Sequence, residues 1–366
     1  MEILTRYREV LVEAMDSLVG GPPSPILAMC RYHLGLAEVD GTTTRASAGK
    51  MLRPALCLAM CEALGGDIHQ CLPAALSLEL THRTSLIFDD IQDRSPQRNH
   101  RPTIWGVWGV DQAINAGLAL SCYARLALHG MAERGVSPGT FHEIQRLLEH
   151  TVIDLTRGQY LDIHFQQAMS PVSIPTLGDY LEMVRLKTGV LLGTACEVGA
   201  MVAGAQDRYE TARRFGESLG TAFQLQDDIL GTWGDPEVTG KSSSDLSEGK
   251  TSLPIVLAMK QGQEELWPLL QVSRAGPDGV ERLRDKLTSW DIRSRAEALI
   301  EQHRWQRVSL RGLVWMRPGR ERSRSCSAFL SPAPCEPNCK KVSAFKTYSD
   351  GWSPLDTLVT CCSILL

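Results

Sequence analysis

Long helical periodicity most constrains what this chain can fold into. From about residue 5 to residue 300, apolar residues recur three and four positions apart, and turns such as Gly65-Gly66-Asp67 separate the segments. Alternating runs typical of strands are nearly absent, which excludes a parallel sheet or a dinucleotide-binding fold. We therefore predict an all-α protein, a large single-domain helical bundle. The clearest predicted helices span residues 52–64, 72–92, 111–133, 140–161, 177–203, 207–230 and 250–260.

Composition limits which kinds of partner the chain can bind and in which cellular compartment we expect it. The chain has 366 residues and a formal net charge of -4, so no basic field suggests nucleic acid. Its apolar stretches are broken well before the ~20 residues that a bilayer span needs. The first 18 residues carry acids and are typical of an amphipathic helix rather than a signal peptide. Eleven cysteines stand without CxxC spacing, which favours reduced core thiols and a cytoplasmic protein.

The last sixty-five residues have a different character. From Gln302 onward there are ten Lys/Arg against four Asp/Glu, together with five of the eleven cysteines. This stretch is rich in Arg, Ser and Pro and has no helical period, so we predict a disordered or loosely attached tail. We divide the chain into a helical domain, residues 1–301, and a basic tail, residues 302–366. The tail is either an interaction arm or a nonessential extension, and we favour the latter.

Adjacent aspartates close one strongly apolar segment. Asp89 and Asp93 stand one helical turn apart, so both carboxylates lie on one face, about 6 Å apart along the axis. Two carboxylates ~4 Å apart in a partly desolvated cleft repel by about 4 kcal/mol at an effective dielectric near 20, and a cation between them relieves the repulsion. Hard oxygen ligands favour Mg²⁺. Taken alone, this cluster is more typical of a solvated acidic helix end.

A second cluster changes that balance. Asp227 and Asp228 close another apolar segment about 140 residues later, so the two helix ends can face each other across the mouth of a bundle. Cations follow or precede both clusters, and a carboxylate–cation arrangement of this kind is typical of a Mg²⁺-assisted diphosphate site. These cations are Lys50, Arg53, Arg98, Arg101, Lys241 and Lys250.

The motifs resemble a known family. GKMLRP, LELTHRTSLIFDDIQD, RNHRPT, GQYLD, KTG, FQLQDD and GDPEVTGKSSSDLSEGKTSLP occur in the order and approximate spacing of the trans-isoprenyl diphosphate synthases, or polyprenyl synthetases. The match runs from about residue 40 to 260. It implies the isoprenoid synthase type I fold around a central substrate cavity, and a homodimer.

The resemblance also implies a reaction and a role for each residue. An allylic diphosphate ionises and condenses with isopentenyl diphosphate to give a longer all-trans polyprenyl diphosphate. Asp89 and Asp93 would coordinate two Mg²⁺ ions and Asp227 a third, supported by Asp90 and Asp228. The resemblance assigns the diphosphate of isopentenyl diphosphate to Lys50, Arg53 and His82. It assigns the allylic diphosphate to Arg98, Lys187, Lys241 and Lys250. The oxygens of Thr188 and Gln224 would lie beside the carbocation.

Several positions depart from the family pattern. Asn99 stands where a second arginine usually helps to bind isopentenyl diphosphate, and His100 and Arg101 are near enough in sequence to compensate in part. Gly231 replaces a frequent third aspartate, an outer ligand at most. The tail lacks the family's closing helix. These departures leave two alternatives open: a terpene cyclase-like enzyme that ionises without condensing, and a noncatalytic regulatory subunit.

Product length depends on the residues one turn before Asp89. Bulky aromatics there stop the product near farnesyl length in this family, but this chain has Thr84 and Ser85. Ser77 and Thr81, further down the same predicted helix, are small as well. We expect an open tunnel and a product of C20 or longer.

Overall fold

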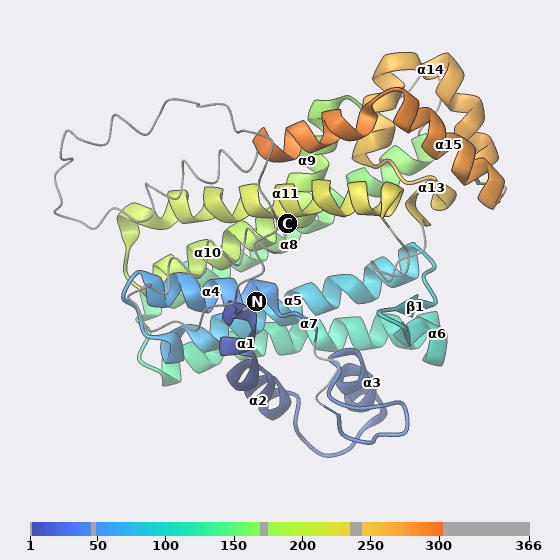
Figure 1. The fold of residues 1–366 in the computed structure, drawn as a ribbon. Helices are drawn as coiled ribbons and strands as arrows, with labels where there is room; N and C mark the ends of the chain where they lie inside the picture. The colour runs from blue at the N-terminus through green and yellow to red at the C-terminus, as the bar shows by residue number, and fades with distance from the viewer. Residues whose placement is uncertain (1, 45–48, 169–174, 235–243, 275, 303–366) are drawn as a thin grey trace, which may run out of the picture.

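The computed structural model describes residues 2–44, 49–168, 175–234, 244–274 and 276–302, and helices dominate them (Figure 1). This confirms the all-α prediction. The predicted tail, apart from Gln302, lies outside the described residues. The helices are α1 (Glu2–Arg6), α2 (Arg8–Leu18), α3 (Pro25–His33), α4 (Leu52–Ala63), α5 (Ile68–Gln92), α6 (Ile104–Trp108), α7 (Val110–Glu133), α8 (Pro138–Ala168), α9 (Leu177–Val184), α10 (Val190–Val202), α11 (Tyr209–Trp233), α13 (Ser244–Glu248), α14 (Leu253–Ser273) and α15 (Pro277–Ser289).

Two predicted helices differ from the observed ones in instructive ways. Residues 177–203 form a nearly continuous rod, but its middle, Arg185–Gly189, winds as a π-helix between α9 and α10. The helix expected from residue 250 begins at Leu253 instead, because Ser252 adopts an extended N-cap conformation and Pro254 occupies the first turn. Lys250 therefore lies before α14 rather than on it.

A short hairpin is the only sheet among the described residues. β1 (Gln97–Arg98) pairs antiparallel with β2 (Arg101–Pro102). Asn99 and His100 connect them with φ of 51° and 62°, the left-handed conformation that a two-residue hairpin turn requires. The strand pattern was too short for the sequence to indicate it.

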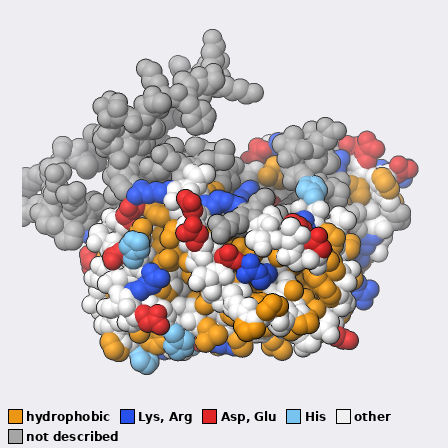
Figure 2. Space-filling view, turned by 90° about the horizontal axis from the view of Figure 1, so that it is seen from below, with side chains coloured by type: hydrophobic (Ala, Val, Ile, Leu, Met, Phe, Trp, Pro, Cys, Tyr) orange, Lys and Arg blue, Asp and Glu red, His pale blue; other side chains and the backbone are white. Residues whose placement is uncertain are grey.

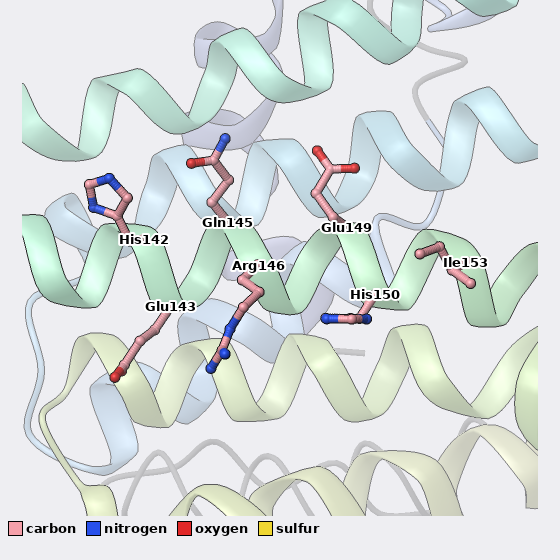
Figure 3. Close-up of a pocket in the computed structure, with 7 residues that line it drawn as sticks. All are labelled: His142, Glu143, Gln145, Arg146, Glu149, His150 and Ile153. Atoms are coloured by element: carbon pink, nitrogen blue, oxygen red, sulfur yellow. The ribbon is translucent and has the colours of Figure 1, made fainter.

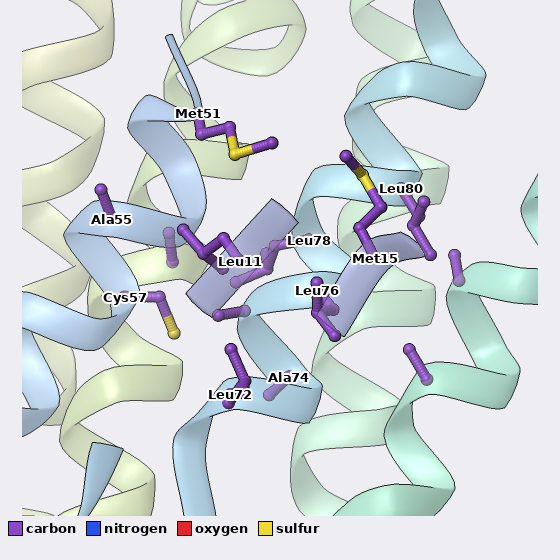
Figure 4. Packing of buried hydrophobic residues seen from close by; sticks show 14 of the residues in the cluster. Leu11, Met15, Met51, Ala55, Cys57, Leu72, Ala74, Leu76, Leu78 and Leu80 are labelled. Atoms are coloured by element: carbon purple, nitrogen blue, oxygen red, sulfur yellow. The ribbon is translucent and has the colours of Figure 1, made fainter. Parts of the chain in front are cut away.

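Burial of apolar faces holds the bundle together in two clusters. The larger joins α2, α4, α5, α7 and α10, and Figure 4 shows part of it, with Leu11, Met15 and Leu78 packed together from α2 and α5. The smaller joins α9, α11, α14 and α15. Leu78 and Leu80 are both fully buried although they lie two residues apart, because α5 is covered on several sides.

The arrangement places two helix ends together. α5 packs mainly on α7 and α4, and α11 packs mainly on α10. The C-terminal ends of both helices lie at the same end of the bundle, near β1 and α13 (Figure 1). The Asp-rich segments predicted to face each other stand at these two ends.

The surface carries mixed charge. On the face turned toward the viewer in Figure 2, acidic, basic and hydrophobic side chains are interspersed. None of the described helices is both long and apolar enough to cross a membrane.

Candidate active site

The end of α5 presents three carboxylates in two orientations. The side chains of Asp89 and Asp93 are 20% and 17% exposed, whereas Asp90 points inward and is 4% exposed. Arg98 bridges the adjacent pair: its Nε donates to Asp90 Oδ1 at 2.7 Å and its Nη2 to Asp89 Oδ2 at 3.0 Å. Burial raises the pKa of Asp90 to about 6, even though Arg98 opposes that shift.

Asp93 ends α5 as its C-cap residue. Lys250 Nζ lies 3.7 Å from Asp93 Oδ2. Burial, and then the neighbouring charge of Asp89, raise the pKa of Asp93 above its usual value. The two partly exposed carboxylates therefore repel each other, and a cation bound between them would relieve this repulsion.

The π-helical turn brings a third cation to this end. Lys187 Nζ lies 2.5 Å from Asp162 Oδ2 and 3.5 Å from Asp89 Oδ1. Burial would lower the pKa of Lys187, but Asp162 and Asp89 outweigh it and raise the value. Gly158 of α8 makes this approach possible, because a Cβ there would stand 2.4 Å from the Lys187 backbone nitrogen. Single π turns of this kind often mark functional sites.

The end of α11 is organised around Asp228, which is 7% exposed. Tyr180 donates its hydroxyl to Asp228 Oδ2 at 2.5 Å, and the Leu253 amide donates to the same oxygen at 2.8 Å. Gln224 Nε2 donates to the other oxygen at 3.0 Å. Burial raises the pKa of Asp228 to about 6. The half-buried Asp227 precedes it on the helix.

Two consecutive residues connect the two ends. Lys187 reaches Asp89 at the end of α5, while Thr188 Oγ1 donates to Gln224 Oε1 at 3.0 Å, one turn before Asp228 on α11. The π turn thus contacts both Asp-rich ends that are predicted to face each other. We call these ends the α5 wall and the α11 wall.

A separate cationic group lies beside α4 and α5. Arg53 Nε is buried without a hydrogen-bond partner among the described residues, and burial lowers the pKa of Arg53 to about 10. The pKa of His82 is lowered far below its usual value. Burial is the main cause, and the nearby charges of Arg53 and Arg83 add to it. Lys50 is exposed at the start of this region. A cationic group with an unsatisfied donor suits a bound anion.

The donor set also fits Mg²⁺. The side chains of Asp89 and Asp93 are partly exposed, and their charged partners, Arg98, Lys187 and Lys250, have long side chains that can turn away. Within the described residues, no group of three or more His, Cys, Asp or Glu forms a metal cage of its own. Magnesium sites commonly use one or two carboxylates per ion together with phosphate oxygens and water, so this arrangement suits ions that arrive with a diphosphate.

Comparison with known proteins decides the family. The polyprenyl synthetase model matches residues 41–287, well over half of the chain. The chain belongs to the polyprenyl synthetase family. A geranylgeranyl diphosphate synthase of Mycobacterium tuberculosis is 36% identical over 334 residues, which cover 90% of this chain and 87% of that protein. A (2E,6E)-farnesyl diphosphate synthase of Mycobacterium bovis is 38% identical over 233 residues, 63% of this chain and 62% of that protein.

Solved structures agree with the fold of this polyprenyl synthetase. A polyprenyl synthetase from Streptomyces coelicolor superposes with a TM-score of 0.68 at 31% identity, covering 85% of this chain and 90% of that one. A geranylgeranyl pyrophosphate synthetase from the archaeon Geoglobus acetivorans superposes with a TM-score of 0.77 at 24% identity, over 100% and 99% of the two chains, and supports the fold alone.

The structure also shows what lies at the departures from the family pattern. Arg101 is engaged away from the cleft: its Nη2 donates to the Ala37 carbonyl and to Glu38, and its guanidinium lies 4.4 Å from the Tyr32 ring centroid. His100 is exposed in the hairpin turn. Neither residue therefore lies beside Arg53 and His82 as a substitute for the missing arginine.

At Gly231, the second departure from the family pattern, the Asp245 carboxylate fills the space that a side chain would take. A Cβ at Gly231 would stand 1.9 Å from Asp245 Oδ2, so Asp245 occupies the volume of the absent side chain. Asp245 lies 3.9 Å from Lys250 Nζ, and Glu248 lies 3.1 Å from it. Lys241 lies outside the described residues.

Sequence reasoning gave no role to Gln159 and Asp162 of α8. Gln159 Nε2 donates to Asp89 Oδ1 at 3.2 Å, and Asp162 holds Lys187. Both belong to the GQYLD motif and lie three residues apart on one helical face, a signal that could have placed them in the site.

A surface hollow lined by described residues lies away from these two helix ends. About 520 Å³ opens on the exposed side of α8 (Figure 3), with side chains from one helix only. They are His142, Glu143, Gln145, Arg146, Glu149, His150 and Ile153.

Proposed function

We propose that this chain is a Mg²⁺-dependent trans-prenyltransferase that condenses an allylic diphosphate with isopentenyl diphosphate. Family membership makes it a prenyltransferase of isoprenoid biosynthesis. The observation that carries the finer assignment is the π turn, where Lys187 contacts the α5 wall and Thr188 the α11 wall. A diphosphate between the walls would meet cations and carboxylates from both.

Three Mg²⁺ ions are proposed, with Asp89 and Asp93 as ligands of two and Asp227 of the third. When bound, they would neutralise the leaving diphosphate and stabilise the charge that develops as the allylic C–O bond breaks. Asp90 and Asp228 support these ligands from behind, because Arg98 holds the first and Tyr180, Gln224 and the Leu253 amide hold the second.

The chain's cations would then change partners. Arg98, Lys187 and Lys250, now paired with Asp89 and Asp93, would turn to the phosphate oxygens of the allylic substrate once those carboxylates bind metal. Lys241 is proposed beside them by resemblance. Thr188 and Gln224 would place oxygen dipoles beside the developing carbocation, at a distance that their mutual hydrogen bond fixes.

Isopentenyl diphosphate is proposed to bind at Lys50, Arg53 and His82. The unpartnered Arg53 Nε supports this assignment, because a buried guanidinium nitrogen without an acceptor gains from a phosphate oxygen. His82 is neutral at pH 7, since its pKa is lowered, and can donate one ring N–H to the same anion.

Product analysis tests the reaction. The purified chain is incubated with Mg²⁺ and dimethylallyl, geranyl or farnesyl diphosphate, with and without isopentenyl diphosphate, and products are separated and weighed by mass spectrometry. We expect elongation only when isopentenyl diphosphate is present. Cyclised products formed without it would identify a terpene cyclase-like enzyme, and no consumption of any allylic diphosphate would favour a regulatory subunit.

A product of C20 or longer is proposed from the small residues on α5. Ser77 is buried, and the Thr84 hydroxyl is buried with no hydrogen-bond partner among the described residues, so no large side chain fills these positions. Thr84→Phe or Ser85→Phe should shorten the product by at least one C5 unit. Ser289→Phe, at an exposed position on α15, is the control and should leave the length unchanged. An unchanged spectrum in all three variants would exclude this wall of the tunnel.

A homodimer is proposed through α7 and α8. Ile114, Leu118 and Leu126 of α7 and Ile153 of α8 are 40% to 58% exposed, an apolar surface that a second copy would cover. Leu118→Glu should give a monomer by light scattering, whereas the wild type should be dimeric. We also propose a cytoplasmic location and a dispensable tail, so removal of residues 303–366 should leave elongation intact.

A further inference from the structure

Arg83 is a charged residue that the proposed mechanism does not use. It follows His82 on α5 and is 8% exposed. Its Nε donates to Glu79 at 2.7 Å, one turn earlier on the same helix. The pair is nearly dry, since the two side chains are 10% and 3% exposed. A buried ion pair often adds little net stability to a fold, which suggests that the Arg83–Glu79 pair acts on the groups beside it.

Those neighbours are the groups assigned to isopentenyl diphosphate. Arg53 and His82 both lie within electrostatic range of Arg83, and Arg53 also lies within range of Glu79. The Arg83 guanidinium packs directly under the loop that carries Lys50. A Cβ at Gly49 would stand 2.5 Å from Arg83 Nη2, so glycine is required there both for this contact and for its φ of 74°.

The pairing leaves Arg53 uncommitted. Glu79 accepts a hydrogen bond from Arg83 Nε, whereas Arg53 Nε has no hydrogen-bond partner among the described residues. Lys50, Arg53 and Arg83 together set three positive charges against the single negative charge of Glu79. Without Arg83 the balance would fall from +2 to +1, and Glu79 would be free to bind Arg53 instead of the substrate.

We propose that Arg83 is a positioning residue of the isopentenyl diphosphate site, which supplies from α5 the positive charge that Asn99 fails to supply from the hairpin. It acts by neutralising Glu79, so that Arg53 remains available to the diphosphate. Asn99 itself sits at φ 51° in an exposed turn. The two hairpin arginines have other partners, because Arg98 pairs with Asp89 and Asp90 and Arg101 with Glu38, so their charge near His82 is already balanced. This inference rests on the proposed condensation reaction.

Steady-state kinetics with both substrates tests it. Arg83→Gln should raise KM for isopentenyl diphosphate about tenfold, the effect of one unit charge several ångströms away at an intermediate dielectric. KM for the allylic diphosphate and kcat should change less than about twofold, because Arg98, Lys187 and Lys250 are untouched. Calorimetric titration with isopentenyl diphosphate alone should show the same loss without turnover. Arg31→Gln, which breaks the Arg31–Asp16 pair on α3 and α2, is the matched control.

Two further variants separate charge balance from simple damage. Arg83→Gln combined with Glu79→Gln returns the net charge to +2 and should restore KM to within about threefold of wild type. Arg83→Gln combined with Asn99→Arg should restore it as well. Glu79→Gln alone should lower KM for isopentenyl diphosphate, and this variant decides the question if Arg83→Gln fails to fold.

The outcomes that overturn the proposal are distinct from failure of the proposed function. An Arg83→Gln enzyme that elongates normally with unchanged KM, or a rise in both KM values together, removes Arg83 from this site. A double variant Glu79→Gln/Arg83→Gln as weak as the single variant excludes the charge-balance mechanism. Absence of any elongated product from the wild type would instead refute the condensation reaction itself.

Discussion

The C-terminal ends of α5 and α11 carry the same adjacent aspartates in two different surroundings. At the end of α5, Asp90 and its neighbours are balanced by full positive charges from Arg98, Lys187 and Lys250. At the end of α11, Asp228 is held by neutral donors, a tyrosine hydroxyl, a side-chain amide and a backbone N–H. Burial raises the pKa of the inner aspartate to about 6 in both walls.

This contrast in bonding partners also implies a contrast in mobility. The cations that pair with the α5 aspartates can move, whereas the neutral donors that hold Asp228 are fixed. Arg98, Lys187 and Lys250 come from the hairpin, the π turn and the segment before α14, and their long side chains can rotate from carboxylate to phosphate at small cost. Tyr180 and the Leu253 amide are buried parts of α9 and α14 and fix the α11 wall to the second core. One wall is suited to exchange charge with a substrate, and the other to hold its geometry.

The largest expected effect comes from the outer aspartates. Asp89→Asn and Asp227→Asn should each lower kcat by about 10³-fold or more, since each removes a hard anionic ligand worth several kcal/mol to the transition state. Circular dichroism should show an unchanged helical content. Asp154→Asn on α8, whose carboxylate pairs with Arg157 at the surface, should retain wild-type kcat. A loss in only one of the two site variants would mean that the walls do not act together.

The next effect is on the stability of the α5 wall. Arg98→Gln leaves the inward-facing Asp90 without its ionic partner and should lower the free energy of unfolding by about 3 kcal/mol, the lower end for a broken buried pair because Arg98 itself is 34% exposed. Urea unfolding in Mg²⁺-free buffer measures it. Raising the salt concentration should shrink the difference from wild type, since a partly exposed ion pair is screened. A loss independent of salt would contradict the ionic description of this wall.

The matching change in the α11 wall is smaller and of another kind. Tyr180→Phe removes the hydroxyl that donates to Asp228, while the donors from Gln224 and Leu253 remain. We expect a loss of about 2 kcal/mol, typical of one buried hydrogen bond to a charged acceptor. The same urea experiment should show no dependence on salt. If salt changed the Tyr180→Phe effect as it changes that of Arg98→Gln, the contrast between the walls would disappear.

Periodicity predicted the helices well, because it depends on local sequence, and motif spacing singled out the outer carboxylates for the same reason. The partners of those carboxylates depend on tertiary contacts that spacing does not encode. Asp162 contacts Lys187 only because Gly158 lets α8 approach the π turn, and Asp245 fills the volume at Gly231 from a separate helix. The sequence places Arg101 near enough to substitute in part for the missing arginine, but Tyr32 and Glu38, which are far away in sequence, contact it instead.

The same local-versus-tertiary distinction governs Asp90 and Asp228. The sequence places each directly after an outer aspartate and predicts a supporting role. That both point inward follows from helical rotation of about 100° per residue, and could be anticipated. That one meets an arginine and the other a tyrosine could not, because α9 and the hairpin reach the cleft only in the folded chain.

The smallest predicted effect is one of pH, and it has opposite signs at His33, which contacts α5, and at Asp228 in the α11 wall. His33, which supports α5 through a hydrogen bond to the Arg83 carbonyl at 2.8 Å, has its pKa lowered to about 3 by burial and by the charges of Arg83, Arg98 and Arg101. A histidine whose folded pKa lies below the unfolded value stabilises the fold above about pH 6.5 and loses that contribution as the pH falls toward 3. Between pH 7.5 and 5.5 the loss is about 1.4 kcal/mol.

Asp228 behaves in the reverse way. Its folded pKa of about 6 lies above the unfolded value, so its contribution is lost as the pH rises from about 4 to 6, and acidification from pH 7.5 to 5.5 returns about 0.8 kcal/mol. In urea unfolding without Mg²⁺, His33→Gln should flatten the acid loss, whereas Asp228→Asn should steepen it. His142→Gln, at an exposed position on α8, should leave the pH profile unaltered. If both variants changed the slope in the same direction, burial would not favour the deprotonated histidine and the protonated aspartate.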